Sequence, residues 1–96
     1  MTPLAYASKG GHDTIVELLL ATKKVNPNAR NDQKRTPLLQ AAKRGHEAVV
    51  RLLLTEEVDL DAQDDRQRTA LLYAEENGYE GIVKLLLSKS NRTTLT

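Results

Sequence analysis

Residues 36–54 read TPLLQAAKRGHEAVVRLLL, and most of this stretch occurs twice more in the chain. Its opening Thr36-Pro37-Leu38 matches Thr2-Pro3-Leu4, 34 residues earlier, and Thr69-Ala70-Leu71, 33 residues later. The Gly-His or Gly-Tyr step and the run that ends in three leucines keep the same spacing. Three landmarks that share one period predict an array of supersecondary units stacked in a row.

The middle copy indicates how one unit is built. Thr36 is a favourable N-cap and Pro37 suits the first helical position, so a first helix is expected to begin there. Gly45 should end it, because glycine tolerates the left-handed conformation of a helix C-cap. Apolar residues at helical spacing predict a second helix from about Glu47 to Leu54. Each unit is therefore expected to be a pair of helices joined by a short turn.

The composition bounds the class of protein. The 96 residues include no Cys, and the chain has neither a basic start followed by an apolar run nor an apolar stretch of membrane-spanning length. We therefore expect one intracellular, cytoplasmic domain without disulfide bonds or a membrane partner. The net charge of +1 conceals an asymmetry, since residues 23–44 carry seven basic side chains and one acidic one, whereas residues 45–80 carry ten acidic and three basic ones.

No constellation of catalytic or metal-binding residues is recognisable. His12 and His46 occupy equivalent positions in successive units, and helices stacked about 8–10 Å apart would place them too far apart to share a zinc ion. The segment from Asp59 begins like a calcium loop, but Asp64 and Ala70 stand where that loop needs Gly and Glu. We expect a solvated acidic finger there, and no enzyme activity, metal or cofactor.

The landmarks resemble the ankyrin repeat: Thr-Pro-Leu opening a short helix, an Ala-Ala pair, Gly-His, and then Ile-Val-x-Leu-Leu-Leu on a 33-residue period. The resemblance implies an all-α solenoid, a stack of three helix-turn-helix units with short β-hairpin fingers between them. The single domain would span residues 1–96, with a partial first repeat (1–30), a second repeat (31–63) and a third repeat with a polar C-terminal end (64–96). Residues 18–28 also resemble the linkers of long fungal ankyrin arrays that are attached to signalling ATPase modules.

The chain departs from the family pattern in its polar segments. The family usually has Gly two residues before the Thr cap, at a turn position that needs a positive φ, and Lys34 and Gln67 stand there. If the turn is kept, each residue costs about 1 kcal/mol relative to Gly. The family's His after Thr-Pro-Leu, which ties neighbouring loops, is replaced by Ala5, Leu39 and Leu72. Both departures predict softer fingers.

The resemblance also implies a non-catalytic module that binds one protein or peptide through a concave face of finger tips and first helices. The candidate contact residues are Arg30, Asp32, Gln33, Arg35, Lys43, Arg44, Gln63, Asp65, Arg66, Arg68, Tyr73, Glu76 and Asn77. The alternative is a structural spacer, or a sensor segment cut from a longer array of a multidomain signalling protein. We expect a monomer in either case.

Two details of this face stay open from sequence. Lys43 and Arg44 are expected near Arg30 and Arg35, where they would bind an acidic partner, pair with the acidic finger or remain solvated. Nucleic acid is disfavoured, since the chain has little net charge and three Tyr as its only aromatic residues. Tyr6 and Tyr73 hold matching positions and are either binding anchors or covers for the helix pairs.

Overall fold

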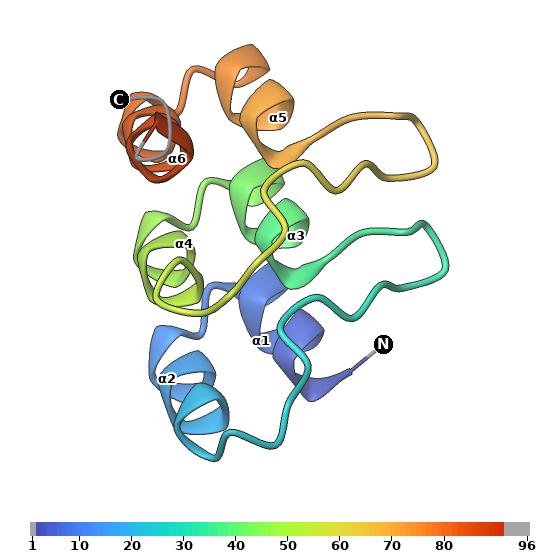
Figure 1. Cartoon of the computed structure of the whole chain (residues 1–96), viewed down its shortest axis with the longest axis vertical. Coiled ribbons are helices and arrows are strands. Elements are labelled where there is room, and N and C mark those ends of the chain that lie inside the picture. The colour runs from blue at the N-terminus through green and yellow to red at the C-terminus, as the bar shows by residue number, and fades with distance from the viewer. Residues whose placement is uncertain (1, 92–96) are drawn as a thin grey trace.

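Two parallel columns of helices make up the protein, as a computed structural model that describes residues 2–91 shows (Figure 1). The first column holds the first helix of each unit and the second column holds the second helix. In chain order the helices of the described part are α1 (Pro3–Gly10), α2 (Asp13–Ala21), α3 (Pro37–Arg44), α4 (Glu47–Leu53), α5 (Ala70–Glu76) and α6 (Glu80–Asn91). No helix within residues 2–91 is long and apolar enough to cross a membrane.

Local chemistry sets the ends of these helices much as expected. The hydroxyls of Thr2, Thr36 and Thr69 each accept a hydrogen bond from the backbone amide three residues further on, at 3.1–3.2 Å. These caps satisfy an amide that has no partner within its helix, and so they begin α1, α3 and α5. Gly45 ends α3 with a φ of 78°. The second helix of the middle unit ends at Leu53, one residue earlier than expected, with Leu54 as its C-cap.

The hydrophobic core lies between the two columns and continues from one unit to the next. Ala41, Ala42 and Ala74 have no exposed surface, and their small side chains let the first helices approach one another closely. Val50 and Leu53 of α4 are buried equally completely. The burial is therefore shared between neighbouring units, as in other linear stacks.

The turns between the two helices of a unit form joints between units. A Cβ atom on Gly11 would lie 2.7 Å from the ring of His46, and one on Gly45 would lie 2.8 Å from the ring of Tyr79. Glycine is needed there both for the positive φ and for the space that the next unit's ring occupies. The Nε2 atom of His46 also lies 2.9 Å from the carbonyl oxygen of Lys9. His46 is thus a structural residue of the stack.

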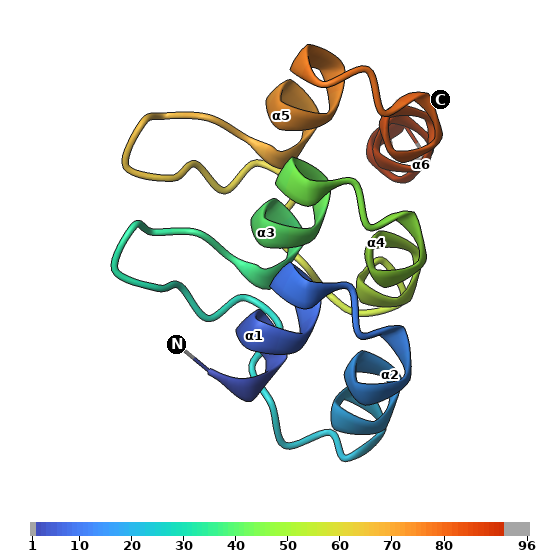
Figure 2. The same cartoon turned by 180° about the vertical axis from the view of Figure 1, so that it is seen from behind.

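Two fingers, which are the polar segments 26–35 and 59–68, extend from the first column, away from α2, α4 and α6 (Figure 2). Residues 2–91 contain no β-strand, so the expected β-hairpins are not seen as strands. In the second finger, the backbone amide of Asp64 donates to the carbonyl oxygen of Arg68, and the backbone amide of Gln67 donates to the carbonyl oxygen of Asp64. Lys34 and Gln67 have φ values of 62° and 63°, which confirms the left-handed turn expected at these positions.

Candidate functional site

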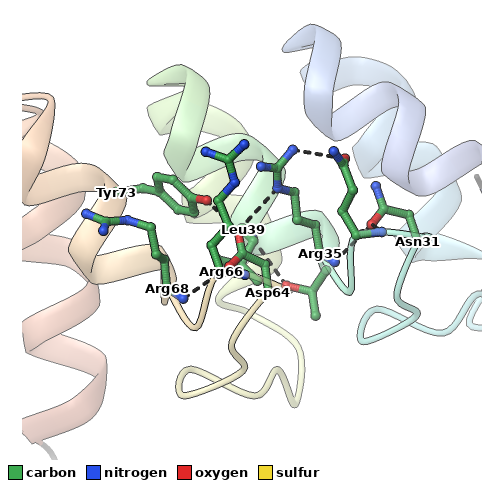
Figure 3. A network of polar contacts seen from close by, with 9 residues as sticks. Asn31, Arg35, Leu39, Asp64, Arg66, Arg68 and Tyr73 are labelled. Atoms are coloured by element: carbon green, nitrogen blue, oxygen red, sulfur yellow. Dashed lines mark hydrogen bonds and ion pairs between the residues drawn. The ribbon is translucent and has the colours of Figure 1, made fainter.

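The carboxylate of Asp64 lies where the two fingers and α5 meet. Its side chain has no exposed surface, and its Oδ1 accepts from the backbone amides of Arg66 at 2.9 Å and Arg68 at 3.1 Å. Its Oδ2 accepts from the hydroxyl of Tyr73 and from Nε of Arg35 at 3.4 Å (Figure 3). Because Arg35 precedes α3 and Tyr73 lies on α5, one carboxylate joins two successive units.

The protonation states in this cluster follow from burial and hydrogen bonding. Burial raises the pKa of Asp64, but hydrogen bonds from Tyr73, from the amides of Arg68 and Arg66, and from Arg35 outweigh it and lower the pKa from 3.8 to about 2. Burial and the bond to Asp64 raise the pKa of Tyr73. At neutral pH the carboxylate is therefore ionised and the phenol remains protonated as its donor.

The burial of Asp64 corrects the expectation of a solvated acidic finger. Its counterpart in the first finger is Asn31, whose Oδ1 accepts from the amides of Gln33 and Arg35, both at 2.9 Å. Each finger thus closes around an Asn or Asp side chain that bonds to its own backbone. The carboxylate at position 64 has a charge in addition, and this charge holds Arg35 beside it in the buried site.

This cluster also connects the fingers without the family's usual His. The amide of Asp65 donates to the carbonyl of Gln33 at 2.9 Å, so the second finger is bonded directly to the first. The side chain of Gln33 in turn accepts from Nη1 of Arg35 at 3.0 Å. The expectation of softer fingers rested on the replaced turn glycines and on the missing His, and it did not foresee this other tether between the fingers.

Cations surround the ring of Tyr73. The guanidinium carbons of Arg68 and Arg35 lie 5.5 and 6.0 Å from the ring centroid, and Nζ of Lys43 lies 5.9 Å from it. These distances are within the range in which a cation is attracted to an aromatic face. Arg68 also forms an ion pair with Glu76.

Further positive charges lie next to this ring of cations. Burial lowers the pKa of Lys43, and the positive charges of Arg35, Arg44 and Arg66 lower it further, against a smaller opposite effect of Asp64. Arg44 and Arg66 are exposed and Lys43 is half-buried. We call Lys43, Arg44 and Arg66 the basic patch.

The structure separates the candidate contact residues into accessible and buried ones. Arg35 and Tyr73 are buried, with exposed fractions of 9% and 6%, so they support the face from beneath. Tyr6, at the position that matches Tyr73, is 65% exposed. Lys43 and Arg68 are half-buried, and the remaining candidates are exposed: Arg30, Asp32, Gln33, Arg44, Gln63, Asp65, Arg66, Glu76 and Asn77.

Arg30 lines an open groove of about 370 Å³ between the fingers. The groove has mixed charge, since Lys34 lies along it as well as Asp61 and Asp65.

Asp64 is the residue of the site that sequence reasoning missed. Its 33-residue equivalence to Asn31 was the available signal, because both head the same kind of turn. Within residues 2–91, no group of three or more His, Cys, Asp or Glu side chains is placed to hold a metal ion.

Comparison with known proteins agrees with this architecture. A family model of ankyrin repeats matches residues 4–96 in three copies. A chain in the solved structure of a predatory endopeptidase from Bdellovibrio bacteriovorus in complex with an immunity protein is similar, with a TM-score of 0.85 and 28% identity. The similarity covers 93% of this chain and 46% of that chain, so this chain spans about half the length of the solved relative. On the family match, the chain belongs to the ankyrin repeat family.

Proposed function

We propose that the chain is a non-catalytic module that binds a partner protein through the face formed by the fingers and helices α1, α3 and α5. The observation that carries the proposal is the basic patch, Lys43, Arg44 and Arg66, which lies over the buried cluster of Arg35, Asp64 and Tyr73. Because that cluster holds the fingers together, little ordering of the fingers is needed on binding. A preorganised face of this kind loses less of its interaction energy to conformational entropy.

The charge of the patch favours an acidic partner. Burial lowers the pKa of Lys43, the like charges of Arg35, Arg44 and Arg66 lower it further, and the Asp64 charge beneath them offsets this only in part. An acidic group on a partner would relieve this repulsion and would also speed the encounter. A nucleic-acid backbone is the poorer fit, because the acidic side chains of Asp32, Asp65 and Glu76 are exposed among the candidate contact residues.

The similar solved chain supports the proposal that the partner is a protein. It comes from a complex between two proteins, an endopeptidase and an immunity protein. Together with the family membership, this favours a binding role over catalysis for the present chain. The partner's identity does not follow from this similarity.

A charge-reversal experiment tests the proposal. The variant Lys43→Glu/Arg44→Glu and the unchanged chain would each be immobilised and used to capture proteins from a lysate of the source cells. We expect the variant to lose the acidic proteins that the unchanged chain retains, and we expect added salt to weaken the retained set.

The matched control is Lys24→Glu/Lys84→Glu, which alters the net charge equally at exposed positions outside the patch. The control should keep the captured proteins, and circular dichroism should show that both variants are folded. If the reversal in the patch leaves the captured set unchanged, the basic patch is not the binding site. The roles of spacer or sensor segment would then be favoured.

A further inference from the structure

The basic patch lies where the middle unit of the stack meets the third unit. Lys43 and Arg44 belong to the last turn of α3, and Arg66 belongs to the second finger. Nζ of Lys43 lies 5.9 Å from the ring centroid of Tyr73, which is a residue of α5. The patch is therefore built inside the stack, with both of the units that contribute to it present.

The carboxylates beside the patch are already used by other groups. Each of the two oxygens of Asp64 accepts two hydrogen bonds, which is about the capacity of a carboxylate. Glu76 is paired with Arg68. Within residues 2–91, no carboxylate forms an ion pair with a side chain of the basic patch. The three cationic heads are thus open to an anionic ligand.

The structure holds these cationic residues close to one another. The backbone amide of Arg66 donates to Oδ1 of Asp64 at 2.9 Å, which fixes the turn from which its side chain extends. In Figure 3 the side chain of Arg66 extends in the same direction as that of Arg35. The positive charges of Arg44 and Arg66 also act on Lys43, whose pKa they lower in addition to the effect of burial. An anion that bridges the three heads would relieve this repulsion without a rearrangement of the fingers.

The number of cations in the patch favours an anion with more than one charge. One carboxylate offers a single negative charge and two oxygens to three cationic heads. A phosphorylated side chain carries a charge of about −1.5 to −2 at pH 7 and three strong acceptor oxygens. The planar guanidinium groups of Arg44 and Arg66 suit two-point bonds to such oxygens, and Lys43 adds a third point of positive charge.

From these observations we propose that the basic patch receives a phosphorylated side chain of the partner protein, with the phosphate bridging Lys43, Arg44 and Arg66. The inference rests on the proposed function, because it requires that the partner binds at this face. A run of unphosphorylated carboxylates and an anionic membrane are the competing occupants.

Titration of the isotope-labelled chain with short peptides, followed by NMR, tests the inference directly. The probe is a blocked pentapeptide with phosphoserine between glycines, and the comparison peptides have Ser, Glu or three successive Glu residues in its place. We expect the phosphopeptide to shift the side-chain N–H signals of Arg44 and Arg66. It should bind about tenfold more tightly than the peptide with one Glu, which is the effect of about one additional charge-assisted hydrogen bond.

Matched variants place the phosphate on the patch. Arg66→Gln should weaken the binding of the phosphopeptide by about tenfold or more, since it removes one charge-assisted contact. Lys24→Gln removes one positive charge at an exposed position outside the patch and should leave the affinity nearly unchanged. Equal weakening by the two variants, or equal binding of the phosphopeptide and the Ser or Glu peptides, would overturn the inference. Preferred binding to the peptide with three Glu residues, or to phosphatidylcholine vesicles that contain phosphatidic acid, would also overturn it.

The capture experiment separates a failure of this inference from a failure of the proposed function. One half of the lysate would be treated with a protein phosphatase and the other half with phosphatase inhibitors before capture by the unchanged chain. We expect the phosphatase to remove the proteins that Lys43→Glu/Arg44→Glu also fails to retain. Proteins that depend on the patch but resist the phosphatase would reject the phosphate and leave the proposed function in place. A captured set that is insensitive to the charge reversal would reject both.

Discussion

The substitution Asp64→Asn removes the charge at the centre of the finger cluster while it preserves the shape of the side chain. The side-chain amide oxygen of an Asn at position 64 can still accept from the backbone amides of Arg66 and Arg68, because Asn31 accepts two equivalent backbone bonds in the first finger. It cannot offer a carboxylate to Arg35 and Tyr73. The variant therefore tests the charge and leaves the turn intact.

The expected loss of stability can be worked out in two ways. A fall in the pKa of Asp64 from 3.8 to about 2 corresponds to about 2 kcal/mol in favour of the charged form, at about 1.4 kcal/mol per unit. A hydrogen bond to a charged group contributes about 1.5–3 kcal/mol when its partner is removed. We expect the free energy of unfolding to fall by about 2–3 kcal/mol.

Urea denaturation followed by circular dichroism measures this loss, with Asp65→Asn as the control. Asp65 is the exposed neighbour in the same finger, and its substitution should change stability by less than about 0.5 kcal/mol. If Asp64→Asn is as mild as the control, then the buried carboxylate does not hold the fingers together and our account of the cluster is wrong.

The stability difference between the unchanged chain and Asp64→Asn should depend on pH. The pKa of Asp64 is lower in the folded chain than in the unfolded one, so its contribution is present above about pH 4 and is lost as the pH falls toward 2. The difference in stability between the unchanged chain and Asp64→Asn should therefore be largest at neutral pH and shrink on acidification. A difference that stays constant down to pH 2 would contradict the assignment.

Three further predictions concern the backbone. Gly45→Ala should lose about 1–3 kcal/mol more stability than Gly78→Ala, because both glycines have a positive φ but only a Cβ at position 45 would meet the ring of Tyr79. Urea denaturation measures the two losses, and equal losses would show that the ring moves aside freely. Lys34→Gly should raise the stability by about 1 kcal/mol by relieving the left-handed φ, and an unchanged or lower melting temperature would refute this. Thr36→Ala should lower the stability by about 1 kcal/mol, while Thr36→Ser, which keeps the capping hydroxyl, should recover most of it.

Much of the fold was predictable from the sequence because its signals are local. The Thr caps and joint glycines act within a few residues, and their repetition at 33 or 34 residues compensates for the weakness of each signal. Even the positive φ of Lys34 and Gln67 was predictable, since the turn geometry is imposed by the unit and not by the residue that occupies it.

The buried cluster was not predictable in the same way, because its partners are distant in sequence. Asp64 is bonded to Arg35, 29 residues before it, and to Tyr73, 9 residues after it. A run of acidic residues normally indicates a solvated segment, and only the packing of the second finger against the first reverses this. Tyr6 and Tyr73 hold matching positions but differ in burial, since Tyr73 is bonded to Asp64 of the second finger and is 6% exposed, whereas Tyr6 is 65% exposed.

The position of the Asp64 carboxylate beneath the basic patch places stability and recognition in opposition. Its negative charge acts on Lys43 in the direction opposite to Arg35, Arg44 and Arg66, so it weakens the positive potential that the patch offers to an acidic partner of the kind we propose. Neutralising Asp64 would make the patch more attractive to such a partner and the stack less stable. Selection for tighter binding alone would favour the loss of this carboxylate. Its presence limits the affinity of the patch for an acidic partner, and a variant without it would need a compensating gain in stability elsewhere in the stack.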